Sequence, residues 1–535
     1  MPGPRLALAT LAATLLLAPA ATLTVPAAAA VPPVFDAGQT LAGAGGAEPS
    51  LAIDTTTTAF RDAIYVSAIP GPNIWRSFDG GRTFKAPVPF DTMGPSRGGD
   101  DDVVVDHNGN VIVDDLNLSH ALVQVSTDHA ATFNTGFPTA YEDDRPWLAV
   151  DGDNVYVAYH DFVLELPVVC KSTDGGQTFA FCNTVFAGDP SALGQCLENT
   201  NPGRSLVVDP VDKSLNFMFS CSTAQENAAQ PPYGPIHDYF LAKSADGGLT
   251  WTTYPIFKAD TSGGRVATYG NFWSTLASDA AGNYYTVFAG TPDDNHPLAN
   301  PYHVWMVVSR DHGRTWGPLV QVDHEADGKG THVLSHIAAT APGQVDIVYY
   351  ASPKTGEPNG VCGDTAAQAT CPEAPFPAWN TAGAPGWKVE MSQSVDALAA
   401  HPSFSQVALT SYYTHYGELC TNGLICGQSD RTLLDYISVG VDCTGLAHVA
   451  YAGTTKADDS ATVRVSNQTG GSRIAPPAAC GPVAAGQSTP GPPVSPGRAP
   501  LPGTGTGAWV PAAALGLAGL IGLALVSLGR KPRSA

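Results

Sequence analysis

Basic side chains are scarce in this chain. Its 535 residues include 26 Lys and Arg against 48 Asp and Glu, which gives a formal net charge of −22. No stretch is rich in Lys or Arg, so the sequence offers no basic face for a phosphate backbone, and we expect no nucleic-acid partner. Charged residues make up only 14% of the chain. This argues against a coiled coil, which is rich in Ala, Glu, Lys, Leu and Arg.

Several motifs of known chemistry are also missing. The sequence contains no CxxC, no HExxH, no phosphate-binding glycine loop and no Gly-x-Ser-x-Gly elbow. The lack of CxxC argues against a zinc cluster or a thioredoxin-like redox site. His332 and His336 would lie about 13 Å apart on one strand, too far to share a metal. We therefore predict no metal ligands and no cofactor, with calcium left open for the acidic loops described below.

The first thirty residues have the features of a secretory signal peptide. Arg5 supplies the positive n-region, Leu6–Ala20 forms an apolar h-region, and Ala28–Ala30 provides a small-residue cleavage site. We expect cleavage after Ala30, so that residues 31–480 form the folded domain outside the membrane.

The other end of the chain has three parts in a fixed order. Residues 481–500 contain six Pro and four Gly, a composition typical of an extended spacer. Leu501–Gly505 reads LPGTG, and an uncharged run of 24 residues, 506–529, precedes Arg530, Lys531 and Arg533. Such a run is long enough to cross a bilayer, with its basic tail on the cytoplasmic side.

Together, these parts resemble the LPxTG sorting signal of Gram-positive surface proteins, here over residues 501–535. The resemblance implies that a sortase cleaves after Thr504 and joins Thr504 to peptidoglycan. The alternative is an ordinary C-terminal membrane anchor with a chance LPGTG.

Ten cysteines, an even number, all lie between Cys170 and Cys480. This suits disulfides in an oxidising compartment, although the sequence does not fix their connectivity. Short loops favour five pairs, namely Cys170–Cys182, Cys196–Cys221, Cys362–Cys371, Cys420–Cys426 and Cys443–Cys480.

One octapeptide pattern, S-x-D-x-G-x-T-[FW], occurs five times. The copies are Ser77–Phe84, Ser126–Phe133, Ser172–Phe179, Ser244–Trp251 and Ser309–Trp316. Asp accepts backbone N–H bonds in a tight turn, Gly supplies a positive φ, and Thr with the aromatic residue begins the return strand. Each copy therefore predicts a β-hairpin tip, although the second has Ala130 in place of Gly.

This octapeptide resembles the Asp-box, or bacterial neuraminidase repeat. The resemblance implies a β-propeller in which the boxes lie between the outer two strands of the blades, away from the binding face. It assigns a structural role to five aspartates: Asp79, Asp128, Asp174, Asp246 and Asp311.

Short strand patterns surround each box. An apolar run, a turn and an alternating run precede it, as in Trp147–Asp151 followed by Val155–Tyr159. Two such strands and the box hairpin make a four-stranded antiparallel blade. We predict an all-β, single β-propeller with seven blades near 48–92, 97–140, 144–190, 201–260, 271–325, 331–410 and 432–470. The last two blades lack the box, and six blades remain an alternative if the first and last are halves of one.

The loops leading into the blades are the candidate binding face. Five arginines lie near the starts of five blades: Arg97, Arg145, Arg204, Arg265 and Arg431. Ring closure would direct them toward one axial cavity, where guanidinium groups suit an acidic sugar. The alternative is that each arginine only braces its own loop, because most have an Asp within a few residues.

The sialidase resemblance also suggests catalytic residues. Sialidases use an arginine triad, a Tyr nucleophile activated by Glu, and an Asp acid/base; the candidates here are Tyr416, Glu418 and Asp144. The Arg-Ile-Pro usual in sialidases is absent. The pairs Asp100/Asp101 and Asp143/Asp144 suit general acid–base chemistry or calcium binding, although neighbours on a strand face opposite ways.

These observations predict a secreted, sortase-anchored, monomeric surface protein. We expect its propeller to recognise an extracellular ligand, a carbohydrate by preference. The alternatives are a sialidase-like exo-glycoside hydrolase acting on acidic sugars and a scaffold that binds proteins.

Overall fold

The computed structural model describes most of the chain between residues 31 and 481. The described ranges are 31–56, 59–69, 73–90, 99–117, 119–164, 166–189, 201–221, 236–264, 267–292, 301–325, 328–356, 358, 386–416, 419, 431–454 and 461–481. The predicted signal peptide, the sorting signal with Thr504, and all but the first residue of the predicted spacer lie outside these ranges. Within the described ranges, no helix is long and apolar enough to span a bilayer.

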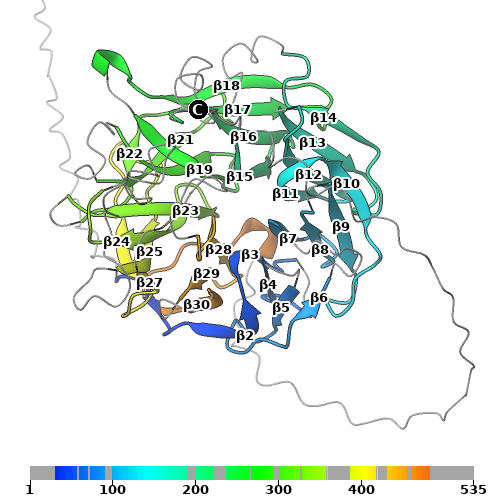
Figure 1. The fold of residues 1–535 in the computed structure, drawn as a ribbon, viewed down its shortest axis with the longest axis horizontal. Helices are drawn as coiled ribbons and strands as arrows, with labels where there is room; N and C mark the ends of the chain where they lie inside the picture. The colour runs from blue at the N-terminus through cyan, green and yellow to red at the C-terminus, as the bar shows by residue number, and fades with distance from the viewer. Residues whose placement is uncertain are drawn as a thin grey trace, which may run out of the picture. The chain divides into compact units, whose positions relative to one another are not determined.

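Strands follow one another in groups of four around a common axis (Figure 1). The first blade comprises β3 (Ala47–Ile53), β4 (Ile64–Ile69), β5 (Asn73–Ser77) and β6 (Val88–Pro89). The second comprises β7 (Asp101–Val105), β8 (Val111–Asp115), β9 (His120–Ser126) and β10 (Phe137–Tyr141). The third comprises β11 (Asp143–Asp151), β12 (Asn154–Asp161), β13 (Leu166–Ser172) and β14 (Phe181–Thr184). Each blade is an antiparallel meander that begins at the axis and ends at the rim.

The next three blades repeat this plan. The fourth comprises β15 (Asn201–Val208), β16 (Leu215–Cys221), β17 (Asp238–Ser244) and β18 (Thr252–Lys258). The fifth comprises β19 (Thr268–Ser278), β20 (Tyr284–Thr291), β21 (His303–Ser309) and β22 (Val320–Gln321). The sixth comprises β23 (Thr331–Ala339), β24 (Val345–Ser352), β25 (Gly386–Ser394) and β26 (Ser405–Ala408), with β27 (His415–Tyr416) paired to β25.

The seventh blade joins the two ends of the folded domain. Its inner strands are β28 (Ser438–Val441), β29 (Ala447–Gly453) and β30 (Thr462–Gly470), and its outer edge is formed by β1 (Val34–Phe35) and β2 (Gln39–Gly45). The prediction of a seven-bladed, four-stranded antiparallel propeller is thus confirmed, and the six-bladed alternative is wrong. The N-terminal strands complete the last blade instead of forming half of the first one.

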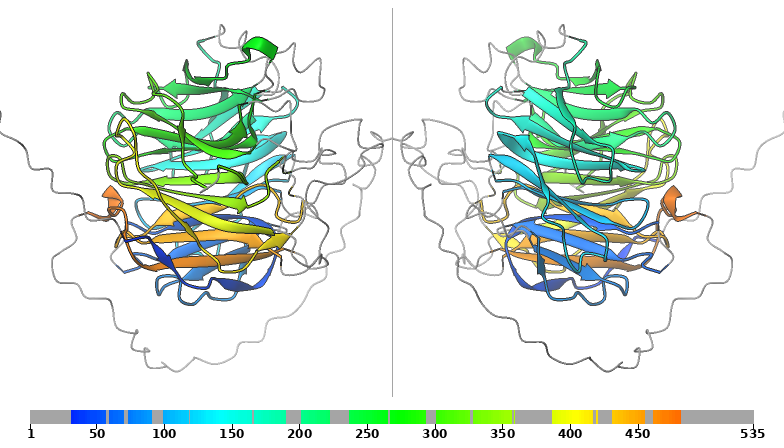
Figure 2. Two further views of the ribbon diagram at one scale, coloured as in Figure 1. Left: turned by 90° about the vertical axis from the view of Figure 1, so that its left-hand side faces the viewer. Right: turned by 90° about the vertical axis from the view of Figure 1, so that its right-hand side faces the viewer.

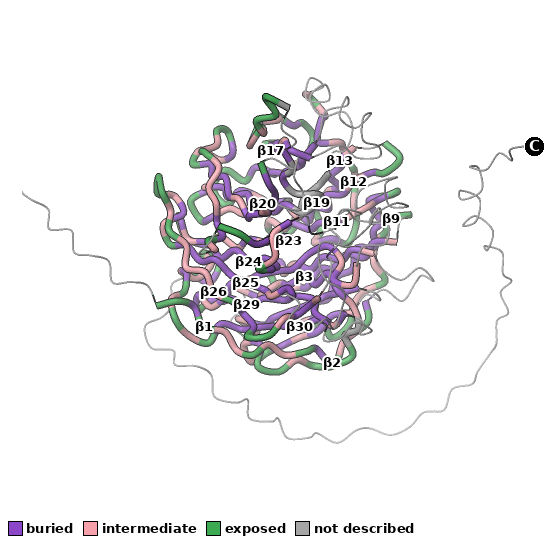
Figure 3. Tube along the Cα trace, turned by 60° about the vertical axis from the view of Figure 1, so that its left-hand side comes forward, coloured by how far each residue is buried: buried purple, intermediate pink, exposed green. Residues whose placement is uncertain are grey.

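The hydrophobic core lies between neighbouring blades. Phe217 and Phe219 of β16, for example, share one cluster with Tyr156 and Ala158 of β12 in the preceding blade. Blades cover the second strand of each sheet on both faces, so β16 is buried along its whole length. This explains the continuous apolar runs of the sequence. Figure 2 shows the strands of the blades from two sides. Buried residues fill the inside of the propeller, and exposed ones lie mainly on its loops (Figure 3).

All five octapeptides fold into the same turn between the third and fourth strands of their blades. In each, one Asp oxygen accepts the Thr N–H at 2.8–2.9 Å and the other accepts the Thr hydroxyl at 2.6–2.7 Å. Ala130, which replaces the glycine, takes a φ of 58° and so keeps the turn geometry.

A longer version of this turn occurs in the sixth blade, where the octapeptide pattern is absent. Asp396 accepts hydrogen bonds from the Ser394 hydroxyl at 3.0 Å and from the N–H and hydroxyl of Ser403, at 2.8 and 2.9 Å. Ser403 stands seven residues after Asp396, instead of the four that separate Thr from Asp in the octapeptide. The pattern search missed this turn because it required a fixed spacing.

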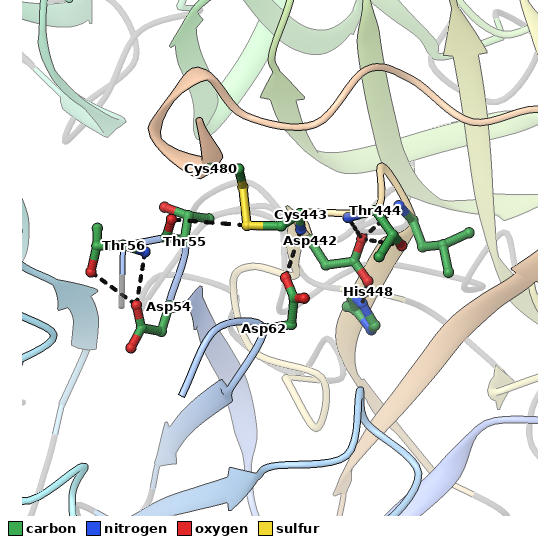
Figure 4. The surroundings of a disulfide bond; sticks show 10 residues. Asp54, Thr55, Thr56, Asp62, Asp442, Cys443, Thr444, His448 and Cys480 are labelled. Carbon is green, nitrogen blue, oxygen red and sulfur yellow. Dashed lines mark hydrogen bonds and ion pairs between the residues drawn. A yellow bond between two sulfur atoms is a disulfide. The ribbon is translucent and has the colours of Figure 1, made fainter. Parts of the chain in front are cut away.

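Two of the five predicted disulfides are confirmed, Cys170–Cys182 and Cys443–Cys480. The other three predicted pairs, Cys196–Cys221, Cys362–Cys371 and Cys420–Cys426, involve cysteines outside the described residues; Cys221 itself is disulfide-bonded. Figure 4 shows that Cys443 follows the β28 strand and faces the first blade. Its N–H donates to Asp62 at 2.6 Å, so this disulfide holds the C-terminal segment at the junction where the ring closes.

Candidate functional site

An axial cavity of about 350 Å³ lies between the innermost strands. Side chains of β3, β7, β11, β15, β19 and β23 form its wall. Most of the residues that line it are apolar, such as Leu51, Val103 and Leu276. Polar groups gather at one end, where Asp102, Arg204 and His336 line it. Cavities of this size that combine apolar walls with few polar groups are typical of small-ligand sites.

Arg204 closes this polar end. Its guanidinium donates to Asp102 at 2.7 Å and to Ser438 at 3.1 Å, and also to Ser50. It lies in the fourth blade, whereas its partners belong to the second, seventh and first blades, none of which adjoins the fourth. The side chain therefore crosses the axis.

Aromatic rings surround the same guanidinium. The centroids of Trp147 and Tyr436 each lie 5.5 Å from the Arg204 Cζ, and the two rings meet edge to face at 5.2 Å. His336 accepts the Val439 N–H at 3.2 Å, and burial, with the charge of Arg204 second, holds its pKa well below the usual value. We call this set the Arg204 layer: Ser50, Asp102, Trp147, Arg204, His336, Tyr436 and Ser438.

Above the Arg204 layer, charged side chains converge from the loops that lead into four blades. We call them the axial mouth: Glu48, Asp100, Asp144, Arg145, Arg431 and Asp435. Arg145 donates twice to Asp144, at 3.0 and 3.1 Å. Arg431 binds both oxygens of Asp435, at 2.7 and 2.9 Å. Asp144 is 33% and Arg431 24% exposed, so these two side chains reach solvent.

β-Bulges direct these side chains. The register of five inner strands shifts close to their start, in β3, β11, β15, β19 and β23. Glu48 and Arg145 lie within such bulges with φ values of 53° and 56°. A bulge re-aims the side chain of its extra residue, so residues that alternation alone would bury in a blade turn toward the axis.

Two acidic groups of the axial mouth form a hydrogen bond with each other. Glu48 is 2% exposed and donates a hydrogen bond to Asp100. Burial, followed by the nearby charge of Asp100, raises the pKa of Glu48 well above its usual value. Burial and the charge of Asp144 raise the pKa of Asp100 to about 7. At neutral pH one carboxyl of the pair therefore carries a proton, because two adjacent carboxylates do not both ionise in a buried site.

In each of the two predicted pairs of adjacent aspartates, one side chain lies at the axis and the other lies inside the blade. Asp100 and Asp144 belong to the axial mouth, whereas Asp101 accepts from the Ser67 hydroxyl at 2.9 Å inside the sheet. Asp143 is fully buried, and burial raises its pKa to about 9. Among the described residues, these four aspartates belong to none of the groups with metal-ligand spacing, so the calcium prediction gains no support.

The three predicted arginines that the structure describes are each held by a carboxylate. Arg145 pairs with Asp144, Arg204 with Asp102 and Arg431 with Asp435. The structure thus brings three of the five predicted arginines together, each with its own counter-ion. Arg97 and Arg265 lie outside the described residues.

Tyr416, one member of the predicted Tyr–Glu pair, lies away from the axial cavity. Tyr416 is in β27 of the sixth blade, 5.5 Å from the ring of Tyr413, and it does not line the axial cavity. Glu418 lies outside the described residues. Of the two catalytic candidates that the structure describes, Asp144 belongs to the axial mouth and Tyr416 does not.

Sequence reasoning missed Glu48, Asp102, Trp147 and Tyr436 as site residues. The sequence did contain a hint of three of them. Asp102, Trp147 and Tyr436 each lie where a loop leads into a strand, near a predicted arginine. Glu48 carried no such signal, since it begins the first blade without an Arg beside it.

No family model matches the chain, and neither does any curated protein. Similar solved structures include a protein of unknown function from Dyadobacter fermentans, with 11% identity and a TM-score of 0.41 over 82% of this chain and 98% of that chain. NanB sialidase from Streptococcus pneumoniae has 12% identity and a TM-score of 0.36, over 82% and 70%. The GH93 α-L-arabinofuranosidase of Fusarium graminearum, in complex with arabinobiose, has 12% identity and a TM-score of 0.36, over 82% of this chain and 97% of that chain. Because these similarities are so low, the ligand and the activity have to be inferred from the residues of this chain.

Proposed function

We propose that the protein binds a carbohydrate at the axial mouth. The observation that carries the proposal is the convergence of six ionisable side chains from four blades, of which Asp144 and Arg431 reach solvent. Guanidinium donors alternate there with carboxylate acceptors, which matches the paired donor and acceptor capacity of sugar hydroxyls. Because Arg204, Trp147 and Tyr436 fill the axis below, the ligand lies on the mouth and not inside the shaft.

The charge balance of the mouth favours a neutral or amino sugar over an acidic one. Four carboxyl groups face two guanidinium groups, and both guanidiniums are already held by Asp144 and Asp435. A ligand carboxylate would have to displace one of these ion pairs and then lie near the remaining acids. The acidic sugar predicted from the arginine count is therefore the less favoured ligand.

Glycoside hydrolysis is the second candidate. Asp100, with a pKa of about 7, is suited to donate a proton near neutral pH, as a general acid must. Asp144, held by Arg145, is the carboxylate beside it. For hydrolysis, Asp100 and Asp144 would take the place of the Tyr416–Glu418 pair of the sialidase resemblance.

A glycan array with neutral, amino and acidic glycans tests the binding proposal. We expect saturable binding of neutral or amino glycans that falls at least about tenfold in Asp144→Asn and Arg431→Met, because each change removes a charged hydrogen bond. Arg314→Met is the matched control, since Arg314 lies on an exposed turn at the other end of its blade. Preference for sialylated glycans, or equal binding by all variants, would contradict the proposal.

Fluorogenic glycosides separate binder from enzyme. Turnover that is lost in Asp100→Asn and retained in Tyr416→Phe supports hydrolysis through the mouth carboxyls. Turnover that depends on Tyr416 would instead restore the sialidase assignment. Binding without turnover across the panel leaves the carbohydrate-binding role alone.

We further propose that the protein is exported and attached to the cell wall through Thr504. The disulfides Cys170–Cys182 and Cys443–Cys480 support an oxidising location. Purified sortase and a fluorescent triglycine peptide test the attachment: we expect labelling of the full chain and none of Thr504→Ala. Equal labelling of both would disprove it, and a fully membrane-retained native protein would favour the plain anchor.

A further inference from the structure

A second polar cluster lies between the fifth and sixth blades, away from the axial cavity. At the centre of this cluster lies His332, on β23, whose side chain is fully buried. Its Nδ1 lies 3.1 Å from the Tyr302 carbonyl oxygen and 3.2 Å from Asp323 Oδ2. Its Nε2 faces the other way and lies 3.4 Å from Glu325 Oε1. One ring nitrogen is thus held by the fold, and the other points at a carboxylate.

A glutamine holds two carboxylates in front of this nitrogen. Gln406 Nε2 donates to Glu390 Oε2 at 2.7 Å and to Glu325 Oε1 at 3.4 Å. The other end of the amide, Oε1, accepts the His324 N–H at 2.7 Å. This bond fixes which way the amide points. Gln406 therefore positions both carboxylates, and its own oxygen is not available as a ligand.

The spacing of the three groups suits one metal ion. One ligand atom each from Glu325, His332 and Glu390 lies within 4.8 Å of the others. Two ligands of a tetrahedral ion bound at about 2.0–2.1 Å lie roughly 3.3 Å apart, close to the 3.4 Å between His332 Nε2 and Glu325 Oε1. An imidazole whose second nitrogen contacts a carbonyl and a carboxylate is the usual arrangement of a metal-bound histidine.

We propose that Glu325, His332 and Glu390 bind a divalent first-row transition ion such as zinc, with His332 coordinating through Nε2. One imidazole and two carboxylates form a nitrogen and oxygen donor set that suits zinc, and three protein ligands leave a fourth position for water. Calcium does not fit, because its sites consist of oxygen ligands.

A neighbouring triad, His303, Asp323 and His332, has similar spacing but a different role. Asp323 already accepts the Val304 N–H at 2.6 Å and contacts His303 Nδ1 at 2.6 Å. Its oxygens and the Nδ1 side of His332 are thus engaged within the fold. Asp323 is a positioning residue, which orients His332 toward the ion.

The ion would connect two blades. Glu325 follows β22 of the fifth blade, whereas His332 and Glu390 belong to β23 and β25 of the sixth. These blades are also joined by packing between their faces and by hydrogen bonds such as those of the His332 N–H to the Tyr302 carbonyl and of the His324 N–H to Gln406. Metal binding would therefore raise the stability of the ring as well as create a site with an open coordination position.

Zinc titration of the EDTA-treated full chain by calorimetry tests the proposal. We expect one ion per chain, with affinity at least about 100-fold weaker in Glu325→Gln and Glu390→Gln, because each loses a charged ligand. Glu325 is 36% exposed, so its variant should keep the fold, which circular dichroism checks. Asp212→Asn is the matched control, because Asp209, Asp212 and His312 form a separate group with similar spacing.

The outcomes separate clearly. Loss of binding in the two glutamate variants and its retention in Asp212→Asn support the site, and diffraction at the zinc edge should place the ion beside His332 Nε2. Absence of zinc binding to the unsubstituted chain would show a metal-free ion-pair network instead. Unchanged affinity in the glutamate variants, or loss in Asp212→Asn, would also overturn the proposal.

Discussion

Arg204 on β15 donates a hydrogen bond to Asp102 on β7 at 2.7 Å, from the fourth blade to the second. The two side chains are 11% and 6% exposed, and the rings of Trp147 and Tyr436 flank the guanidinium. Little water reaches this ion pair, so neither charge is well solvated if the other is removed. The pair therefore connects opposite parts of the ring at the level where the candidate ligand site ends.

Breaking this pair should destabilise the propeller more than removing both charges together. We expect Arg204→Met to lower the free energy of unfolding by about 3–5 kcal/mol, because Asp102 then remains as a buried, unpaired charge. Adding Asp102→Asn to Arg204→Met should restore part of that loss. Urea unfolding of the two single variants and the double variant measures the coupling. Losses that simply add, with no coupling between the two positions, would show that the ion pair does not act as a unit.

Asp143 should make the free energy of unfolding of the protein fall as pH rises. Its side chain is fully buried, neither oxygen finds a hydrogen-bond partner in another described residue, and burial raises its pKa to about 9. The unfolded carboxyl ionises near pH 3.9, so between about pH 4 and 9 the native state binds more protons than the unfolded state. Stability is then lost as pH increases through this window.

Asp143→Asn removes this cost, because the amide is neutral at every pH. We expect the variant to be more stable than the parent by roughly 1–3 kcal/mol at pH 8 and by little at pH 4, measured by thermal unfolding across this range. Asp153→Asn is the control, because that carboxylate is 73% exposed. A gain of the same size at both pH values would mean that packing, and not ionisation, explains the effect.

The blades were predictable because each is encoded locally. An octapeptide such as Ser77–Phe84 contains its own turn bonds, and the strands next to it show their alternation within a few residues. Contacts across the ring leave no such pattern. Asp102 lies 102 residues before Arg204, and the pairing of β1 with β30 joins segments more than 400 residues apart. Seven blades therefore followed from the sequence, whereas the way the ring closes did not.

Three of the five predicted arginines lie at the axis, whereas Arg97 and Arg265 lie outside the described residues. Arg145 and Arg431 lie at the axial mouth, and each pairs with an Asp a few residues away in the chain, as the loop-bracing alternative had it. The bulges that direct these side chains toward the axis were not visible in the sequence. The zinc proposal shows the same limit. Comparing His332 with His336 along one strand excluded a shared metal, but Glu390 reaches His332 from another strand of the sheet.

The octapeptide turns should lose stability in acid. Burial alone would raise the pKa of Asp128, but hydrogen bonds from Thr132 and Ser126 outweigh it and lower the pKa to about 2. A carboxylate with a depressed pKa contributes stability above its unfolded value near 3.9, and this contribution is lost as pH falls toward 2. The same direction holds for the aspartates of the other four turns: Asp79, Asp174, Asp246 and Asp311.

Asp128→Asn tests this dependence in one turn. We expect the variant to unfold at a lower temperature than the parent at pH 6, because it loses its charged hydrogen bonds, and to approach the parent near pH 2. Calorimetric scans between pH 6 and 2 measure the convergence. A constant difference over this range would show that the Asp128 charge contributes nothing to the turn.

The two confirmed disulfides should differ in their contribution because they close loops of different length. Cys443–Cys480 spans 37 residues and Cys170–Cys182 spans 12. Loop-closure entropy predicts losses of about 4 and about 3 kcal/mol when each pair is replaced by serine. Cys443–Cys480 also fastens the segment after β30 beside Asp62 of the first blade, so its removal should additionally loosen the closure between the first and last blades. Denaturant unfolding measures the first effect, and hydrogen exchange of β1, β2 and β30 measures the second. If Cys170→Ser/Cys182→Ser destabilises the chain more, or if exchange in these three strands is unchanged in Cys443→Ser/Cys480→Ser, the disulfide does not hold the ring closed.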